Sequence, residues 1–133
     1  MSRRIDRLLR EYRFGPANYV MTDPDYPPDQ PHCGPGVYFI VAIPDRFSVA
    51  IPDRAKIGKS SDVRLRLANL QTGNPAHLHL AHAIYEPDAD RRHAIEADLH
   101  HRFRHLRKNG EWFRWTDELH KYVYILCSEE CYL

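Results

Sequence analysis

The sequence has little cysteine and no long apolar run. Its three cysteines, Cys33, Cys127 and Cys131, form no CxxC pair. So few cysteines, odd in number, argue against a disulfide framework and favour a cytoplasmic protein. His120, Cys127 and Cys131 are three candidate ligands of the two kinds that zinc prefers, histidine and cysteine, but no fourth ligand is identified. No apolar run approaches the roughly 18 residues of a membrane span, and no secretory signal is recognisable.

Excess charge is also lacking, because the formal net charge is only +1. The chain is therefore not a polycation, and any contact with nucleic acid must come from a local patch. The 133 residues are 43% hydrophobic, which is typical of one folded domain with a modest core.

The apolar periodicity predicts an α+β fold with a small, mainly antiparallel three-stranded sheet flanked by helices. The predicted elements are a helix over 3–14, a proline-rich linker over 15–35, strands over 36–43 and 49–57, a helix over 61–72, a strand over 78–85, a long helix over 90–108, an aromatic turn or short strand over 111–115, and a last helix capped by Thr116. The chain then divides into an N-terminal helix and linker (1–34), a central domain (35–116) and a C-terminal helix packed on that domain (117–133).

Strand, turn and helix follow one another between residues 55 and 73. Gly58 is expected to supply the turn, and the sequence repeats Ala-Ile-Pro-Asp-Arg just before it, at 42–46 and 50–54. Lys59 and Arg66 are seven residues apart, two helical turns, so both cations can face one side. They then suit a phosphate, although two ordinary solvated side chains fit the spacing equally well.

Three residues of the long helix share a face: His93, Glu96 and His100. Glu96 lies beside the apolar stripe and should face a partly buried cleft. A single carboxylate with waters and phosphate oxygens is how Mg²⁺ is usually held. The three side chains together suit a transition metal instead, and a surface pair of Glu96 with Arg92 or His100 is the plainer alternative. Residues 91–108 also carry six Arg or Lys against two acids, an excess of four positive charges.

Six short motifs in order resemble the phage-type branch of the GIY-YIG nuclease superfamily over roughly residues 35–116. They are Gly36-Val37-Tyr38, Lys56-Ile57-Gly58-Lys59, Arg66, Leu70-Gln71-Thr72-Gly73-Asn74-Pro75, Glu96-Ala97-Asp98-Leu99-His100 and Gly110-Glu111-Trp112-Phe113. Lys56 stands where the superfamily has a second tyrosine, a replacement common in the phage-type branch.

The resemblance implies a metal-dependent DNA endonuclease that hydrolyses phosphodiester bonds with Mg²⁺ or Mn²⁺. Tyr38, with a pKa lowered by Lys59, would help to activate water; Arg66 would grip the phosphate; Glu96 would hold the metal. The implied site residues are Tyr38, Lys56, Lys59, Arg66 and His100 for catalysis, Glu96 for the metal, and Lys59, Arg64, Arg102, Arg104, Lys108 and Asn109 for nucleic acid.

Two other functions stay open. One is a catalytically weak or inactive DNA-binding module that uses the basic face of residues 91–108. The other is a small metal-binding protein that uses His93, Glu96 and His100. DNA is the expected partner, with a homodimer or a protein partner supplying specificity, and no membrane.

Overall fold

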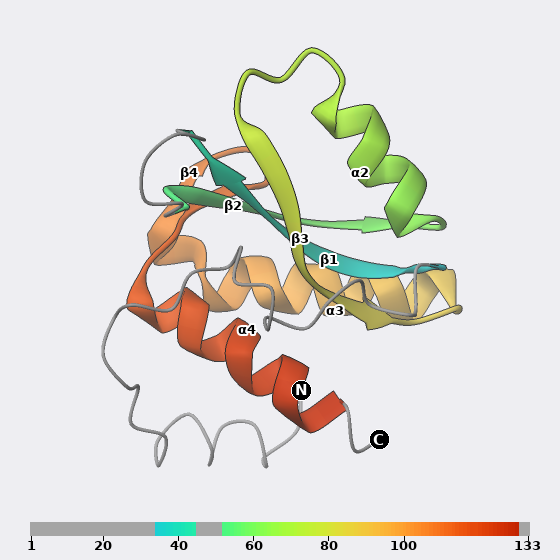
Figure 1. Ribbon diagram of the computed structural model, residues 1–133. Helices are drawn as coiled ribbons and strands as arrows, with labels where there is room; N and C mark the ends of the chain where they lie inside the picture. The colour runs from blue at the N-terminus through green and yellow to red at the C-terminus, as the bar shows by residue number, and fades with distance from the viewer. Residues whose placement is uncertain (1–33, 45–51, 131–133) are drawn as a thin grey trace.

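The computed structural model describes residues 34–44 and 52–130 (Figure 1). The predicted helix over 3–14, nearly all of the linker and the tip of the first hairpin lie outside the described residues. Within the described part, no helix is long and apolar enough to cross a membrane.

One antiparallel sheet forms the centre of the fold, with the strand order β3-β1-β2-β5-β4. The strands are β1 (Gly36–Ile43), β2 (Arg54–Ser60), β3 (His77–Tyr85), β4 (Arg107–Asn109) and β5 (Trp112–Arg114). Every residue of β1 is buried, as expected for a central strand with β2 on one side and β3 on the other.

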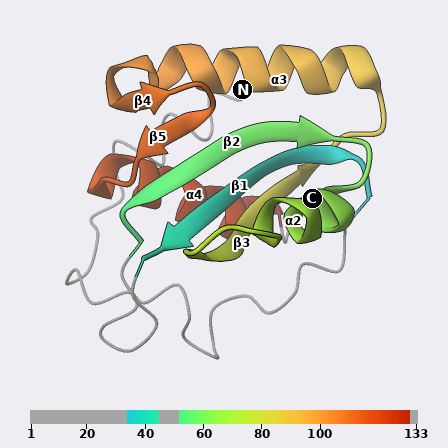
Figure 2. The same ribbon diagram turned by 90° about the horizontal axis from the view of Figure 1, so that it is seen from above.

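Helices cover both faces of this sheet. They are α2 (Val63–Gln71), α3 (Ala89–Arg102) and α4 (Asp117–Glu130), with a 3-10 turn, η1 (Arg104–Leu106), after α3. Figure 1 shows α2 above the sheet and α3 and α4 below it. Seen from above in Figure 2, α3 runs alongside β2.

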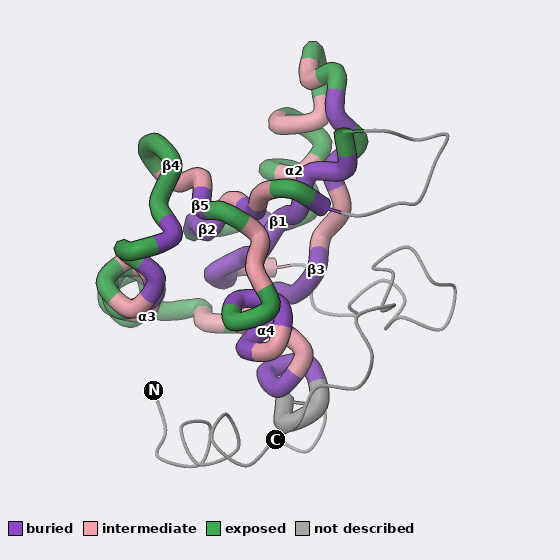
Figure 3. Tube along the Cα trace, turned by 90° about the vertical axis from the view of Figure 1, so that its left-hand side faces the viewer, coloured by how far each residue is buried: buried purple, intermediate pink, exposed green. Residues whose placement is uncertain are grey.

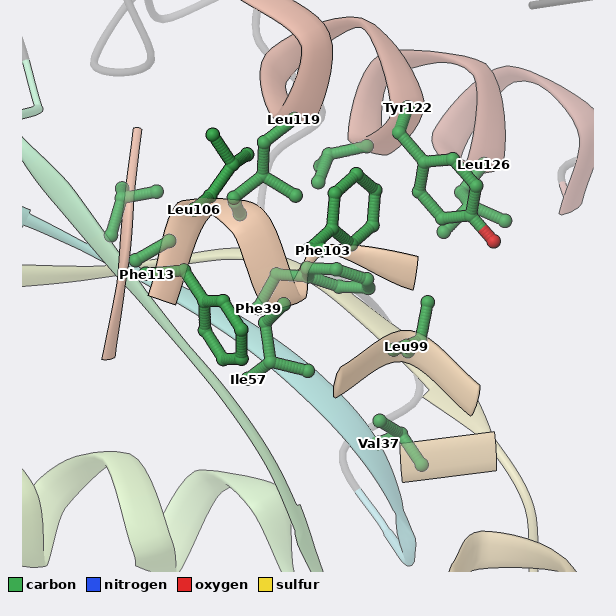
Figure 4. Close-up of a cluster of buried hydrophobic side chains, with 14 of the residues drawn as sticks. Val37, Phe39, Ile57, Leu99, Phe103, Leu106, Phe113, Leu119, Tyr122 and Leu126 are labelled. Atoms are coloured by element: carbon green, nitrogen blue, oxygen red, sulfur yellow. The ribbon is translucent and has the colours of Figure 1, made fainter. Parts of the chain in front are cut away.

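The larger core lies between the sheet and the pair α3 and α4 (Figure 4). Its members alternate along β1 and include Val37 and Phe39, which pack with Leu99 of α3. The other β1 face, with Tyr38 and Ile40, joins a smaller cluster under α2. One face of α4 (Asp117–Glu130) also belongs to this core, through Leu119, Val123, Leu126 and Cys127.

The sheet has five strands, so the prediction of three was wrong. Residues 103–108 were assigned to the end of the long helix, but α3 ends at Arg102 and the chain returns as the β4–β5 hairpin. Both strands have only three residues, and all of β4 is exposed, so neither leaves a periodic signal. Gly110, directly after β4, begins the hairpin turn with a positive φ of 53°.

The second strand is shifted from its predicted range, from 49–57 to Arg54–Ser60. It continues to Ser60 because Gly58, Lys59 and Ser60 pair with the start of β1. Gly58 is thus inside a strand and does not supply the turn.

An aspartate caps the N-terminus of each of the helices α2 and α3. Asp62 accepts a hydrogen bond from the Leu65 N–H at 3.1 Å, and Asp88 accepts one from the Arg91 N–H at 3.0 Å. These side chains satisfy N–H groups that the helix leaves unpaired in its first turn.

Two leucines separate the contribution of the core from that of helix composition. Leu99→Ala should lower the free energy of unfolding by about 2–5 kcal/mol, because this fully buried side chain would leave a cavity. Leu65→Ala on α2 is the matched control, since Leu65 is 57% exposed. Urea unfolding measures both, and an equal effect of the two substitutions would contradict the assigned core.

Candidate active site

Tyr38 crosses the sheet directly above Gly58. The two residues are paired in register between β1 and β2. A Cβ at position 58 would lie only 2.4 Å from the Tyr38 hydroxyl oxygen and 2.6 Å from Cζ. Glycine is therefore required for the ring to lie flat across β2, and the hydroxyl reaches the outer side of that strand. Tyr38 is only 1% exposed.

Arg66 of α2 meets the end of this ring. Its guanidinium hydrogen-bonds the Tyr38 hydroxyl, which lowers the phenol pKa, but burial raises that pKa by more. The negative charges of Glu111 and Glu96 raise it further. The pKa of Tyr38 is therefore above its ordinary value of 10.0, and the expectation of a lowered pKa was wrong. The expected cation was Lys59, whereas the cation that contacts the hydroxyl is Arg66.

Helix α3 is aligned with the outer edge of β2 by two histidines. The His100 Nε2–H donates to the Ile57 carbonyl at 2.8 Å, and the Lys59 ammonium donates to His93 Nδ1 at 2.6 Å. Glu96 lies between these histidines on the same face of α3. That face places its carboxylate at the level of Gly58, where the Tyr38 hydroxyl ends, which is why Glu96 acts on the pKa of Tyr38.

The carboxylate of Glu96 suits a hard cation. Its Oε2 atom is buried and has no hydrogen-bond partner in the part of the chain that the structure describes. A buried charged oxygen without a partner is costly unless a cation or donor satisfies it. One carboxylate is enough for Mg²⁺ or Mn²⁺ when waters and phosphate oxygens complete the shell. Among the described residues there is no group of three His, Cys, Asp or Glu that could hold a metal, so the three-ligand transition-metal hypothesis has no support.

Lys56 and Glu111 complete the charged cluster. Lys56 Nζ lies 3.1 Å from Glu111 Oε2, and the two side chains are 12% and 38% exposed. The backbone carbonyl of Glu111 also accepts a hydrogen bond from the Ile57 N–H at 3.0 Å, which fixes the hairpin turn against β2. We call Tyr38, Lys56, Arg66, Glu96 and Glu111 the Tyr38 cluster.

The structure brings together four of the predicted site residues: Tyr38, Lys56, Arg66 and Glu96. Lys59 projects from the opposite face of β2, because successive strand residues alternate. The expectation that Lys59 and Arg66 face the same side was therefore wrong. His100 is occupied by the Ile57 carbonyl and contacts Phe113 edge-on at 5.1 Å, a placement that holds α3 to the sheet.

Glu111 was missed as a site residue. The Gly110-Glu111 pair, directly before the aromatic stretch, is the sequence feature that could have indicated it. The hairpin that brings Glu111 beside Lys56 was not predicted.

Four of the predicted nucleic-acid residues have different surroundings. Arg102 stacks over Tyr122 at 4.8 Å, in a groove between α3 and α4. Arg104 donates to the His101 carbonyl. Lys108 and Asn109 instead line a separate groove at the β4–β5 hairpin.

Fold and site together define an α+β domain with a partly buried cluster of opposite charges around a tyrosine. The chain belongs to the T5orf172 domain family, whose model matches residues 19–129. This match is to a different family from the GIY-YIG superfamily inferred from the motifs, and that assignment is corrected accordingly. Membership is compatible with a phage-type nuclease or a DNA-interacting module and specifies no activity. No curated protein and no solved structure matches the chain.

Gly58→Ala should destabilise the protein by about 1–3 kcal/mol, because the added methyl collides with the Tyr38 ring. Most of that cost should disappear when Gly58→Ala is made together with Tyr38→Ala, which a double-mutant cycle measures by thermal unfolding. Gly34→Ala is the control, since its Cβ would meet Tyr85 at an ordinary 3.7 Å. Equal costs with and without Tyr38 would contradict the crossing.

The raised pKa of Tyr38 predicts a loss of stability at high pH. Below pH 10 the phenol is protonated in both states; above it the unfolded chain ionises first, so the free energy of unfolding falls as pH rises toward the folded-state pKa. The fall attributable to Tyr38 should approach about 1.4 kcal/mol per pH unit. Tyr38→Phe should remove it, whereas Tyr85→Phe, at a 56% exposed position, should not. Urea unfolding on both sides of pH 10 tests this, and identical profiles for wild type and Tyr38→Phe would refute it.

Proposed function

We propose that the protein is a metal-dependent DNA endonuclease, a phosphodiester hydrolase that acts at the Tyr38 cluster. The main support is the buried Oε2 of Glu96, which has no hydrogen-bond partner among the described residues and lies beside the hydrogen-bonded pair of Tyr38 and Arg66. A carboxylate that can take a cation, next to a guanidinium that can bind phosphate, is a suitable arrangement for phosphodiester chemistry.

In this proposal Arg66 binds the scissile phosphate. It is an exposed residue of α2, so its guanidinium can leave or share the Tyr38 hydroxyl when a phosphate arrives. Its planar fork suits two phosphate oxygens. Lys56 supplies a second positive charge on the same face of the sheet and is itself held by Glu111.

Tyr38 acts as a neutral phenol at physiological pH, since its pKa is raised. Its oxygen accepts from Arg66, and its proton remains to be donated to a phosphate oxygen or to the attacking water. It thereby orients water, and a tyrosinate base is not part of the proposal.

Mg²⁺ or Mn²⁺ bound to Glu96 would stabilise the negative charge that develops on the leaving oxygen. Glu111, the other carboxylate that acts on the pKa of Tyr38, is already paired with Lys56. We therefore expect metal binding, and with it metal-dependent activity, to require Glu96.

A DNA-binding module without hydrolysis is the second candidate. It is favoured by the pairing of Lys56 with Glu111, which reduces the free positive charge at the site. It is also favoured by the raised pKa of Tyr38, which leaves no phenolate to act as a base.

Nicking of supercoiled plasmid DNA in Mg²⁺ or Mn²⁺ tests the endonuclease proposal. Glu96→Gln and Arg66→Ala should each lower the rate about 10²-fold or more, the usual effect of removing one charge-stabilising group. Arg66→Lys should recover little, because the charge returns without the fork. Glu118→Gln is the matched control, because Glu118 is exposed and pairs with His105 away from the Tyr38 cluster.

Metal binding has its own readout without DNA. Mn²⁺ should raise the melting temperature of the wild type and of Glu118→Gln but not of Glu96→Gln. Absence of nicking, or nicking that Glu96→Gln leaves intact, would overturn the endonuclease proposal. DNA binding without nicking would support the binding module instead.

A further inference from the structure

A groove of about 480 Å³ opens beside the Tyr38 cluster and has no role in the reaction proposed above. Its lining residues are Arg54, Asn74, Lys108, Asn109 and Trp112. Most of these residues come from the β4–β5 hairpin and the connection from α2 to β3, which Figure 3 shows as two separate projections of the trace.

Trp112 is the aromatic member of this groove and is associated with two cations. The Arg54 guanidinium carbon lies 5.1 Å from the Trp112 ring centroid, and Lys56 Nζ lies 5.4 Å from it. Trp112 is half-buried and paired with Lys56 in register, so its backbone is held by the sheet. An aromatic ring on a rigid element beside cations is the arrangement by which proteins stack nucleobases.

The charge of the groove favours a ligand that carries phosphate. Arg54 and Lys108 are positive, and none of the lining residues is acidic. Asp53 pairs with Arg54 at 3.3 Å and offsets part of its charge, and Glu111 pairs with Lys56 outside the lining of the groove. A nucleotide, with a π face and an anionic backbone, satisfies both features.

Two amide side chains at the rim provide polar groups for the edge of a base. Asn74 Oδ1 accepts a hydrogen bond from the Ala76 N–H at 3.0 Å, which fixes the side chain, and its amide nitrogen carries two donors. Asn109 is exposed on the opposite side, at the end of β4. Such groups can hydrogen-bond to the edge of a base. In a duplex that edge is already paired with the complementary base.

The groove and the Tyr38 cluster lie along one line of side chains. Arg54, Lys56 and Gly58 are every second residue of β2, so they share one face of the strand. Consecutive members of this series are roughly 7 Å apart along a strand. A nucleic-acid strand whose phosphate contacts Arg66 can therefore continue past Lys56 to Trp112.

We propose that the groove binds an unpaired nucleotide, stacked on Trp112, next to the phosphate held at the Tyr38 cluster. The neighbouring phosphate rests on the proposed function; the stacked base does not. A paired base inside a duplex has both faces covered, so only an unpaired base can stack on a side chain. The preferred DNA is accordingly single-stranded, or duplex with a flap or gap.

Tryptophan fluorescence gives a direct test. The chain has two tryptophans, and Trp115 packs on the larger core and against His120 at 5.2 Å. In the full chain with Trp115→Phe, Trp112 is the sole reporter. Oligodeoxythymidylate, titrated without divalent metal, should quench it, and a blunt duplex of equal length should quench it much less.

Substitutions then test whether the ring contributes to affinity. Trp112→Ala should weaken binding of oligodeoxythymidylate about tenfold or more, and Trp112→Phe should recover most of the loss because it keeps a stacking face. Trp115→Phe is the matched control and should bind as the wild type does. Melting curves show whether Trp112→Ala is folded. If it is not, the affinity of Trp112→Phe and the fluorescence quenching test the proposal instead.

The outcomes separate this proposal from the endonuclease. Quenching by single strands in a protein that never nicks DNA would support the groove and overturn the enzyme. Nicking without quenching, or equal affinity of wild type and Trp112→Ala for single strands, would overturn the groove and leave the enzyme standing. Tighter binding of blunt duplex than of single strand would also overturn it.

Discussion

The contact on which the site depends is the passage of the Tyr38 ring over Gly58. Because position 58 has no side chain, a buried phenol extends from the central strand to the far side of its neighbour. Only there does its hydroxyl meet Arg66 from one face of the sheet and the charges of Glu96 and Glu111 at the edge. Without this crossing, α2, α3 and the β4–β5 hairpin would carry polar residues with no common point.

The crossing also decides the chemistry of the phenol. A tyrosine at the surface between two cations would ionise easily, but this one is covered, and two carboxylates act against its ionisation. Glu96 Oε2 is buried as well, and within residues 34–44 and 52–130 it has no hydrogen-bond partner. The cluster is therefore set for a cation and a phosphate to arrive together, each offsetting charge that the protein leaves uncompensated.

Periodicity predicted the elements that bury a stripe or a face. The strand over 36–43 and the third strand follow from their apolar residues, and the structure confirms both. β4 could not be predicted in this way, because Arg107, Lys108 and Asn109 are all exposed and carry no apolar pattern. A short strand over 111–115 was one of the predicted alternatives, but its pairing with β2 and β4 was not predicted, and this pairing decides the neighbours of Glu111 and Trp112.

Motif order brought Tyr38, Lys56, Arg66 and Glu96 to attention together, but it could not place them. Lys59 was grouped with Arg66 on helical spacing, and the strand that continues through Ser60 turns it to the other face. Whether a glycine makes a turn or makes room for a ring depends on the residue across the ladder, which spacing does not reveal.

Ile57 has a consequence of a different kind. Its N–H donates to Glu111 of the hairpin and its carbonyl accepts from His100 of α3. One peptide position thus joins the turn that carries one carboxylate to the helix that carries the other. The hydrogen-exchange rate of the Ile57 amide would therefore report on both attachments. Exchange should be slow while both are intact and fast when the hairpin detaches, whether or not substrate or metal is present.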